Sequence, residues 1–272
     1  MSSIIDVIIA LMIMLPIGYV SLVRRWLSKI GALAALTIGL VLIVFGGWAC
    51  LMAVISFYIL SSYFTMYRFE FKISKSVAQK VRGWKNVIAN GAVATFFAIA
   101  EGIYGGGAFL GGFIGAISTA TADTLATEIG LLYPGDPRLI TDLRRKVRPG
   151  TSGAISPLGE FGAILGVLTI GLVFMISRIL DGQLIANFNI VILSCITGII
   201  GTTVDSLLGA TIQAQYLCFK CNCITEESMH TCGSRSKLIR GYAFFNNNIV
   251  NLMSTLTGGL LGFILAYLIP LF

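Results

Sequence analysis

The chain has 272 residues, of which 56% are hydrophobic and 11% are charged. Soluble domains carry about 25% charged residues, so this composition excludes a water-facing globular fold and indicates a chain that lipid solvates. A net charge of +7 would point to nucleic acid in a soluble protein, but here it indicates basic cytoplasmic loops, and no nucleic-acid partner is expected.

About eight apolar stretches, with seven to nine as the range, are candidates to cross a bilayer of the usual thickness. The first is expected to be a retained span, because it lacks the charged leader and cleavage site of a signal peptide. Only Gly46-Gly47 separates the second and third, which predicts a helical hairpin. The fourth, at about 14 residues, is short of the roughly 20 that a crossing needs and is expected to be tilted, re-entrant or extended through Gly102. The expected spans are 4–22, 30–45, 48–66, 87–100, 108–128, 158–177, 189–208 and 247–269.

These spans predict an all-α fold, a polytopic bundle of transmembrane helices that forms one membrane domain over residues 1–272. Residues 1–66 are expected to be peripheral N-terminal helices, and residues 218–240 a cytoplasmic loop. The glycine pairs Gly102–Gly106 and Gly107–Gly111 allow close helix packing within or between chains.

The basic residues divide unevenly between the two sides of the predicted bundle. With the N-terminus outside, 18 of the 19 Lys and Arg residues fall in loops on one side, and only Arg178 falls on the other. Because cytoplasmic loops carry an excess of Lys and Arg, this pattern predicts a multi-pass cell (inner) membrane protein with both termini outside. The polar helix ends, and any active site that they form, would then face the cytoplasm.

Two acids, Asp123 and Asp205, fall near the cytoplasmic ends of their spans and are each followed by a hydroxyl residue, Thr124 and Ser206. A carboxylate within a span costs about 2.5 kcal/mol or more and usually faces a polar cavity. Two acids at similar depth predict a shared Mg²⁺ ion; the alternative is two side chains that reach into cytoplasmic water. Glu128 is predicted to point about 140° away from Asp123 on an ideal helix, or to belong to the following loop.

Asparagines recur at helical spacing in two places. Asn86 and Asn90 share one helical face, and Asn247, Asn248 and Asn251 share another. An asparagine can donate to phosphate or offer its carbonyl oxygen to a cation; the alternatives are helix capping, favoured for Asn86, and contacts between helices. The order Asn then Asp in the first half and Asp then Asn in the second is a weak sign of internal duplication.

A basic and glycine-rich segment precedes the sixth span. A turn of glycines and hydroxyl residues at a helix N-terminus can bind phosphate through its amides, and nearby basic side chains raise the local phosphate concentration. The alternative is a segment that sets the topology and contacts anionic lipid. The candidate residues are Arg144, Lys146, Arg148, Gly150, Thr151, Ser152, Gly153 and Ser156.

The loop over residues 218–240 gathers four of the six cysteines and the single histidine. These residue types and the C-x-x-C spacing suit a structural Zn²⁺ site, and a cytosolic position argues against disulfides. The alternative is a set of reduced thiols without a metal. The candidate ligands are Cys218, Cys221, Cys223, His230 and Cys232.

Five motifs in this order resemble an integral membrane family that includes the plant phytyl-phosphate kinase. They are Asn86-x-x-x-Asn90-Gly, Ala122-Asp123-Thr-x-Ala126-x-Glu128-x-Gly130, Gly150-Thr-Ser-Gly-x-x-Ser156, Asp205-Ser-x-x-Gly209-Ala and Asn247-Asn-x-x-Asn251, so that the resemblance covers roughly residues 80–270. More distantly, Asp123-x-x-Ala126-x-x-x-Gly130 is similar to the nucleotide-site signature of CTP-dependent polyprenol kinases, with Pro134 in place of the second glycine.

The resemblance implies a kinase that transfers phosphate from CTP, or another nucleoside triphosphate, to a prenyl monophosphate. Asp123 and Asp205 are then expected to bind Mg²⁺ on the triphosphate, and the asparagines to orient phosphates or metal. Thr151 and Ser152 would hold an anionic headgroup, while the basic residues of 144–148 offset charge. The alternatives are a transporter with an intramembrane acidic site, and a lipid-binding membrane protein without turnover.

Overall fold

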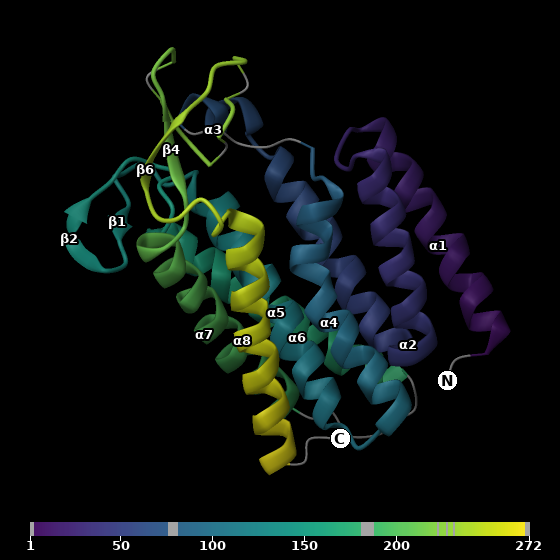
Figure 1. Ribbon diagram of the computed structural model, residues 1–272. Helices are drawn as coiled ribbons and strands as arrows, with labels where there is room; N and C mark the ends of the chain where they lie inside the picture. The colour runs from purple at the N-terminus through teal and green to yellow at the C-terminus, as the bar shows by residue number, and fades with distance from the viewer. Residues whose placement is uncertain are drawn as a thin grey trace.

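The computed structural model describes residues 3–75, 81–180, 188–221, 223–226, 228–230 and 232–269. Within these ranges, seven helices are long and apolar enough to cross a membrane, and they run side by side as one bundle (Figure 1). They are α1 (Ile4–Val23), α2 (Lys29–Met66), α4 (Trp84–Tyr104), α5 (Ala108–Gly130), α6 (Pro157–Leu180), α7 (Asn189–Thr211) and α8 (Asn247–Leu268). The predicted polytopic helical bundle is confirmed.

Helix α2 is a hairpin of two arms. Gly47 interrupts it with φ +70° and ψ −168°, a conformation that glycine adopts without the strain of a side chain. The two arms pack together, because the position of a Cβ on Gly39 would be 3.6 Å from Leu51 Cδ1. In a straight helix these residues would lie about 18 Å apart. The predicted hairpin is therefore confirmed, and among the described residues the seven helices provide eight apolar segments, one from each arm of α2 and one from each other helix.

The expected short fourth span is a full-length helix. Helix α4 extends over 21 residues to Tyr104 and ends at Gly105, which has φ +68°. Of the three alternatives for this span, extension through Gly102 is the one observed. Asn86 does not cap the helix as expected, because the cap is Gly83 and Asn86 lies within the first turn.

Helix α5 is the centre of the bundle and packs against α2, α4, α6, α7 and α8. Every residue from Leu110 to Ala122 is buried, and small residues make this burial on all faces feasible. Gly115 lies directly against the backbone of Gly258 on α8, where a side chain would collide with the Gly258 carbonyl. Gly111 meets Gly262 of α8 in the same way, so α8 runs antiparallel along α5.

The N-terminal region divides into a peripheral and a central part. Helix α1 packs mainly against α2, and apolar residues such as Ile4 and Leu15 are exposed on it. The α2 hairpin, in contrast, packs against α4, α5 and α6. Helix α1 thus lies at the edge of the bundle, whereas the α2 hairpin has neighbours on several sides.

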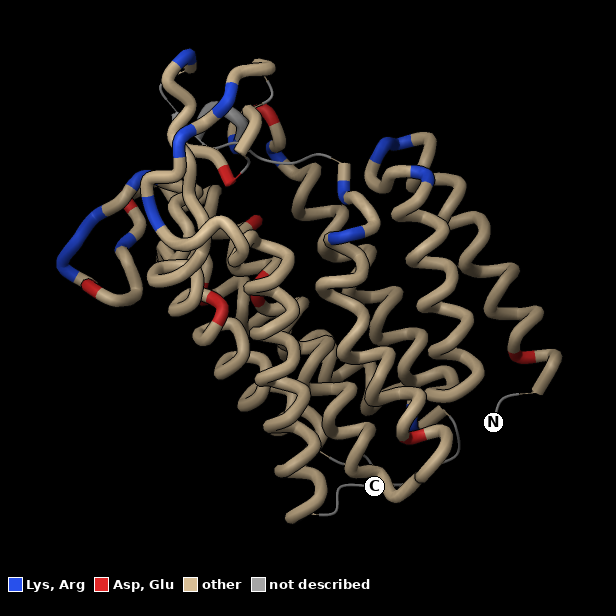
Figure 2. The backbone as a smooth tube through the Cα atoms, in the orientation of Figure 1, with Lys and Arg blue, Asp and Glu red and all other residues tan. Residues whose placement is uncertain are grey.

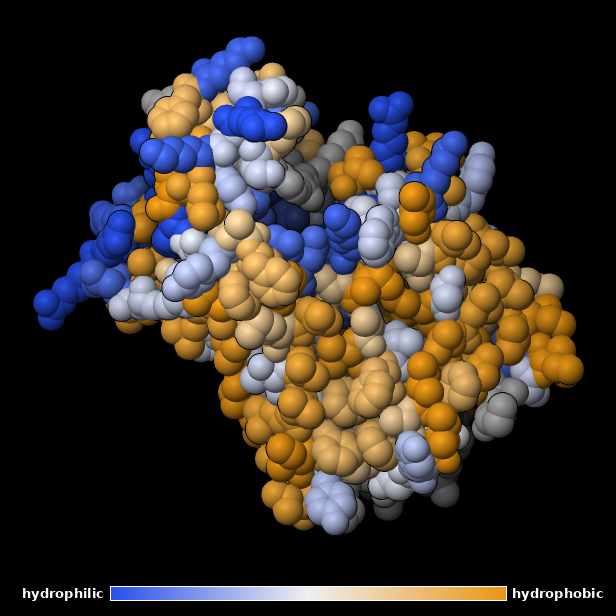
Figure 3. Space-filling view, viewed as in Figure 1, coloured by the Kyte–Doolittle hydropathy of each residue, from blue (hydrophilic) through white to orange (hydrophobic). Residues whose placement is uncertain are grey.

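The two ends of the bundle differ in charge. Lys and Arg gather at the end that carries the large loops, while the start of α1 and the end of α8 lie toward the other end (Figures 1 and 2). On the face shown in Figure 3, apolar side chains cover most of the body of the bundle between these ends. This distribution matches the uneven division of charge in the sequence; the assignment of the basic end to the cytoplasm stays a prediction.

The loops at the basic end contain small elements that the span pattern did not predict. The helix α3 (Phe69–Lys75) follows α2, and two three-stranded antiparallel sheets have the orders β2-β1-β3 and β5-β4-β6. Outside the lipid, these segments satisfy their backbone groups by pairing with one another, so the fold is mostly and not wholly helical. The strands are β1 (Arg138–Leu139), β2 (Asp142–Lys146), β3 (Ala154–Ile155), β4 (Gln215–Cys218), β5 (Cys223–Thr225) and β6 (Lys237–Arg240).

Candidate functional site

The candidate site is a pair of carboxyl groups from two different helices. Asp123 on α5 and Asp205 on α7 are close enough to share a hydrogen bond between their side chains. Asp205 is buried, while Asp123 remains partly exposed. Two carboxylates in contact repel one another unless a proton or a cation lies between them, so this pair is a place where a positive charge is stabilised.

A hydroxyl group from α8 joins the pair. Ser254 Oγ donates to Asp205 Oδ2 at 2.8 Å, and it also lies 3.0 Å from the carbonyl oxygen of Asn251. Ser254 is fully buried, so this contact links α8 to α7 within the bundle. The close packing of α5 and α8 at Gly115 and Gly258 makes this arrangement of three helices feasible.

Two of the predicted asparagines meet beside the acids. Asn251 Nδ2 donates to Asn90 Oδ1 at 3.4 Å, and Asn90 Nδ2 donates to the carbonyl oxygen of Asn86 at 2.9 Å. The Oδ1 atom of Asn251 is buried and has no hydrogen-bond partner among the described residues. A buried acceptor without a donor costs free energy, and here it lies one helical turn from the serine that holds Asp205.

All four of these helices bring their polar residues to the same end. Asp123 precedes the end of α5 by seven residues and Asp205 precedes the end of α7 by six, which is about 10 Å of helix in each case. Asn90 and Asn251 lie within the first two turns of α4 and α8. The acids and asparagines that the sequence singled out therefore form one cluster below the basic loops.

The remaining predicted residues of these helices lie around the cluster. Thr124 and Ser206 follow the two acids and are half-buried, as is Asn248 in the first turn of α8. Asn247 Oδ1 accepts a hydrogen bond from Gln213 Nε2 at 3.4 Å. The cap of α8 is Asn246, whose side chain accepts from the Ile249 amide.

The loop above the cluster adds an acid that the sequence did not single out. Gln213 Nε2 donates to Glu226 Oε1 at 3.0 Å, and the charge of Glu226 acts on Asp123. Glu226 directly follows β5 in the sheet of β4, β5 and β6, so only the fold of this loop brings it near α5. Glu226 lies in a segment of polar residues, so the sequence alone did not indicate that it belongs to the site.

The predicted glycine-rich turn is held by the end of α7 and by β6. Gly153, with φ +77°, packs against Ala210, and Ser152 O accepts from Arg240 at 2.9 Å. Gly150 also has a positive φ, and Thr151 Oγ1 donates back to Arg148 O at 2.7 Å. Ser156 caps α6, because its Oγ accepts from the Gly159 amide at 3.1 Å. Several donors of the predicted anion-binding turn are thus already satisfied by the chain itself, among them the Thr151 amide, the Thr151 hydroxyl and the Ala154 amide.

The basic residues before this turn lie on the surface. Arg144 and Lys146 are on β2, and Arg148 follows it; all three are exposed. Lys146 Nζ is 3.8 Å from Asp136 Oδ2, an exposed ion pair that contributes little to stability. These side chains remain accessible to an anion in the water next to the membrane.

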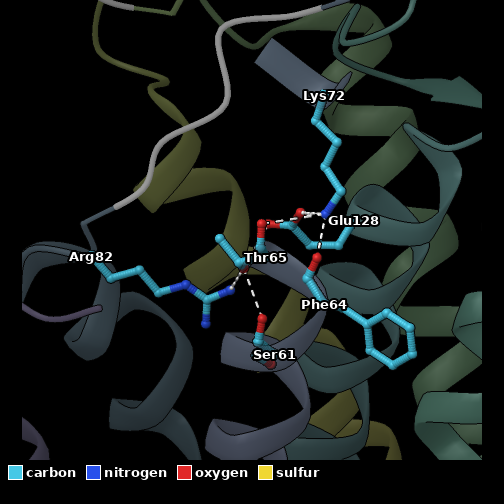
Figure 4. A network of polar contacts seen from close by, with 6 residues as sticks. All are labelled: Ser61, Phe64, Thr65, Lys72, Arg82 and Glu128. Atoms are coloured by element: carbon cyan, nitrogen blue, oxygen red, sulfur yellow. Dashed lines mark hydrogen bonds and ion pairs between the residues drawn. The ribbon is translucent and has the colours of Figure 1, made fainter. Parts of the chain in front are cut away.

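Glu128 lies in a different environment from Asp123, although both are on α5. Lys72 Nζ, on α3 and fully buried, is 2.6 Å from Glu128 Oε2, and Thr65 Oγ1 is 2.7 Å from Glu128 Oε1 (Figure 4). Arg82 donates to the same threonine hydroxyl at 3.0 Å, and Lys72 also contacts the carbonyl oxygen of Phe64. The helix therefore continues through Glu128, which joins α5 to α2 and α3.

The family model described as "Integral membrane protein DUF92" matches residues 12–259. The chain belongs to this family. The membership that the motifs predicted is confirmed; the match begins earlier than residue 80, within α1, and ends within α8. All residues of the acid and asparagine cluster lie inside it.

Three relatives are similar over much of their length. The chain is 30% identical to "Uncharacterized membrane protein MJ0933" of Methanocaldococcus jannaschii over 262 residues, 96% of this chain and 95% of the relative. It is 32% identical to "Protein PGR" of Arabidopsis thaliana over 154 residues, 55% and 52% of the two chains. It is 28% identical to "Uncharacterized membrane protein sll0875" of Synechocystis over 202 residues, 71% and 74%. No solved structure matches the chain.

The family match also includes the cysteine loop. Cys218, Cys221, His230 and Cys232 each offer one ligand atom, and these four atoms lie within 4.8 Å of one another. Hydrogen bonds with His230 and Ser234 lower the pKa of Cys232 to about 5, whereas the contact with Cys232 raises the pKa of Cys221 to about 11. Four of the five predicted ligands thus converge; the side chain of Cys223 lies outside the described residues.

Proposed function

We propose that this membrane protein is a phosphotransferase that converts a prenyl monophosphate to the diphosphate, with CTP as the phosphate donor. The observation that carries the proposal is the contact between Asp123 and Asp205 inside the basic end of the bundle. Two acids in contact within a membrane are unfavourable for stability, and such residues are usually retained for function. The motif resemblance supports the choice of substrates.

The donor set around the acids fits Mg²⁺. Both carboxyl groups and the unpartnered Asn251 Oδ1 are oxygen ligands, which this ion prefers. Asp123 and Asp205 would hold the ion, and the partial exposure of Asp123 leaves room for phosphate oxygens to complete its shell. When bound, Mg²⁺ would neutralise charge on the triphosphate.

The reaction needs no nucleophile from the protein. An oxygen of the prenyl monophosphate attacks the γ-phosphorus of CTP and forms a new P–O bond. The bond between that phosphorus and the β,γ-bridging oxygen breaks, CDP leaves, and the phosphoryl group completes the diphosphate. Because the acceptor is already an anion, the protein's main task is to position two phosphates and offset their repulsion.

The position of the acids suits a lipid and a water-soluble substrate. The acids lie about two helical turns below the ends of α5 and α7, near the depth at which a phosphate headgroup meets the acyl region. A prenyl tail would remain in lipid, while CTP would approach from the water. The exposed Arg144, Lys146 and Arg148 would raise the concentration of both phosphates there.

The test is phosphate transfer by the purified protein. With γ-labelled CTP, Mg²⁺ and a panel of prenyl monophosphates, we expect label to appear in a prenyl diphosphate. Asp123→Asn and Asp205→Asn should abolish transfer. Glu70→Gln, which removes an exposed acid on α3 that is not among the predicted site residues, should leave it unchanged.

Two results would reject the kinase. One is no transfer across the panel of acceptors and nucleoside triphosphates by protein that elutes as a single folded species. The other is equal transfer by the aspartate variants. Solute uptake into proteoliposomes in the absence of transfer would favour a transporter, and binding of prenyl phosphate without either would favour a lipid-binding protein.

A further inference from the structure

The sheet of β4, β5 and β6 carries a cluster of metal-ligating side chains at its outer end. Cys218 is the last residue of β4, Cys221 follows in the turn, and His230 and Cys232 come from the segment between β5 and β6. Antiparallel pairing sets Cys218 opposite Cys223 and so closes the turn that presents Cys221. Backbone hydrogen bonds of His230 with Ser234 and Gly233 shape the second ligand segment.

We propose that Cys218, Cys221, His230 and Cys232 bind one Zn²⁺ ion. Three thiolates and one imidazole are a common ligand set for structural zinc. The pairs Cys218-x-x-Cys221 and His230-x-Cys232 approach from two sides, and their four ligand atoms lie within 4.8 Å of one another. This proposal does not depend on the proposed kinase activity.

The distance between two of the sulfur atoms matches a zinc site. Cys218 Sγ and Cys232 Sγ are 3.7 Å apart. Two thiolates at about 2.3 Å from a tetrahedral ion are separated by about 3.8 Å, whereas a disulfide requires about 2.05 Å. All three cysteines of the set are free, so the geometry is that of ligands around a common centre.

The zinc would fix the sheet above the acid cluster. From this sheet, Gln215 Nε2 donates to Ser152 Oγ at 3.0 Å, and Arg240 donates to Ser152 O and to Gly209 O. Glu226 follows β5 and contacts Gln213. An ion that ties β4 to the segment before β6 therefore stabilises the loop that covers the ends of α6 and α7.

The test is the metal content of the full-length protein. After purification without chelators and without a histidine tag, elemental analysis should find about one zinc per chain. Cys218→Ser together with Cys232→Ser should lose the zinc. Cys50→Ser together with Cys195→Ser, which changes two cysteines within the bundle, should keep it, and so should Cys223→Ser, a cysteine of the same loop outside the proposed set.

A spectroscopic measurement on the unmodified chain makes the result independent of variant folding. Protein loaded with Co²⁺ should show the intense visible bands of a tetrahedral ion and a thiolate-to-cobalt charge-transfer band, and Zn²⁺ should remove both. Wild-type protein with neither zinc nor tetrahedral Co²⁺ would overturn the proposal. Loss of zinc in Cys223→Ser would overturn the ligand set.

Discussion

Helix α5 carries two acids, five residues apart, whose partners have opposite charge. Asp123 contacts another acid, Asp205, whereas Glu128 forms an ion pair with the buried Lys72. The first arrangement places two like charges together, whereas the second neutralises a negative charge with a positive one from the same chain. Both acids lie in the same motif, so residue type and position alone did not distinguish them.

The difference separates a functional role from a structural one. A buried ion pair satisfies its own charges and holds elements together, so its loss lowers stability. Two like charges in contact destabilise the fold, and their neutralisation should not reduce stability. Substitutions at the two places should therefore have opposite patterns of effect on activity and on stability.

The largest effect is expected for Asp123→Asn. Loss of this carboxylate should reduce phosphate transfer by about 10³-fold or more, roughly 4 kcal/mol in the barrier. The melting temperature in detergent should stay the same or rise, because the repulsion with Asp205 is relieved. Rate and melting measurements on one preparation check both parts. A variant that unfolds at lower temperature would assign Asp123 a structural role.

The next effect is on stability and concerns Lys72→Met. With Glu128 left half-buried, without its lysine and with only the Thr65 hydroxyl as a partner, we expect a loss of about 2–3 kcal/mol. The double variant Lys72→Met/Glu128→Met should recover most of it, because an apolar pair can replace a buried ion pair. Thermal or denaturant unfolding of the single and double variants measures both changes in stability. A double variant that remains folded but has lost transfer would bring Glu128 back into the active site.

A smaller effect is expected for Asn251→Ala. This substitution removes a buried oxygen that has no partner among the described residues. If that oxygen faces the ion, the Mg²⁺ concentration for half-maximal transfer should rise about tenfold. Stability should change by less than about 1 kcal/mol, since only the long contact with Asn90 is lost. An unchanged Mg²⁺ dependence would remove Asn251 from the site.

The smallest effect is expected for Ser254→Ala. Asp205 loses a donor at 2.8 Å but keeps its position on α7, and the transfer rate should fall about three- to tenfold. Ser254→Thr, which retains the hydroxyl group, should restore most of the rate. Equal rates in both variants would show that the hydroxyl contact has no part in positioning Asp205.

Much of the fold could be predicted, because membrane composition imposes a simple rule. Lipid requires long apolar helices and leaves charge at the ends, so the spans, the hairpin at Gly47 and the one-sided distribution of Lys and Arg all followed from the printed residues. The two small sheets and α3 did not, because segments in water are free of this requirement. Their strands pair through contacts between distant residues, which no local pattern encodes.

The candidate site shows the same division. Hydropathy and spacing alone determined that Asp123, Asp205, Asn90 and Asn251 lie at one end of the bundle, since a polar group within a span is expensive wherever it lies. Only the tertiary structure decided which of these groups touch. The close packing of α5 and α8 at Gly115 brought Ser254 to Asp205, and the folding of α3 onto α5 gave Glu128 its lysine. Contact between side chains depends on how helices pack, and packing is a property of the whole chain.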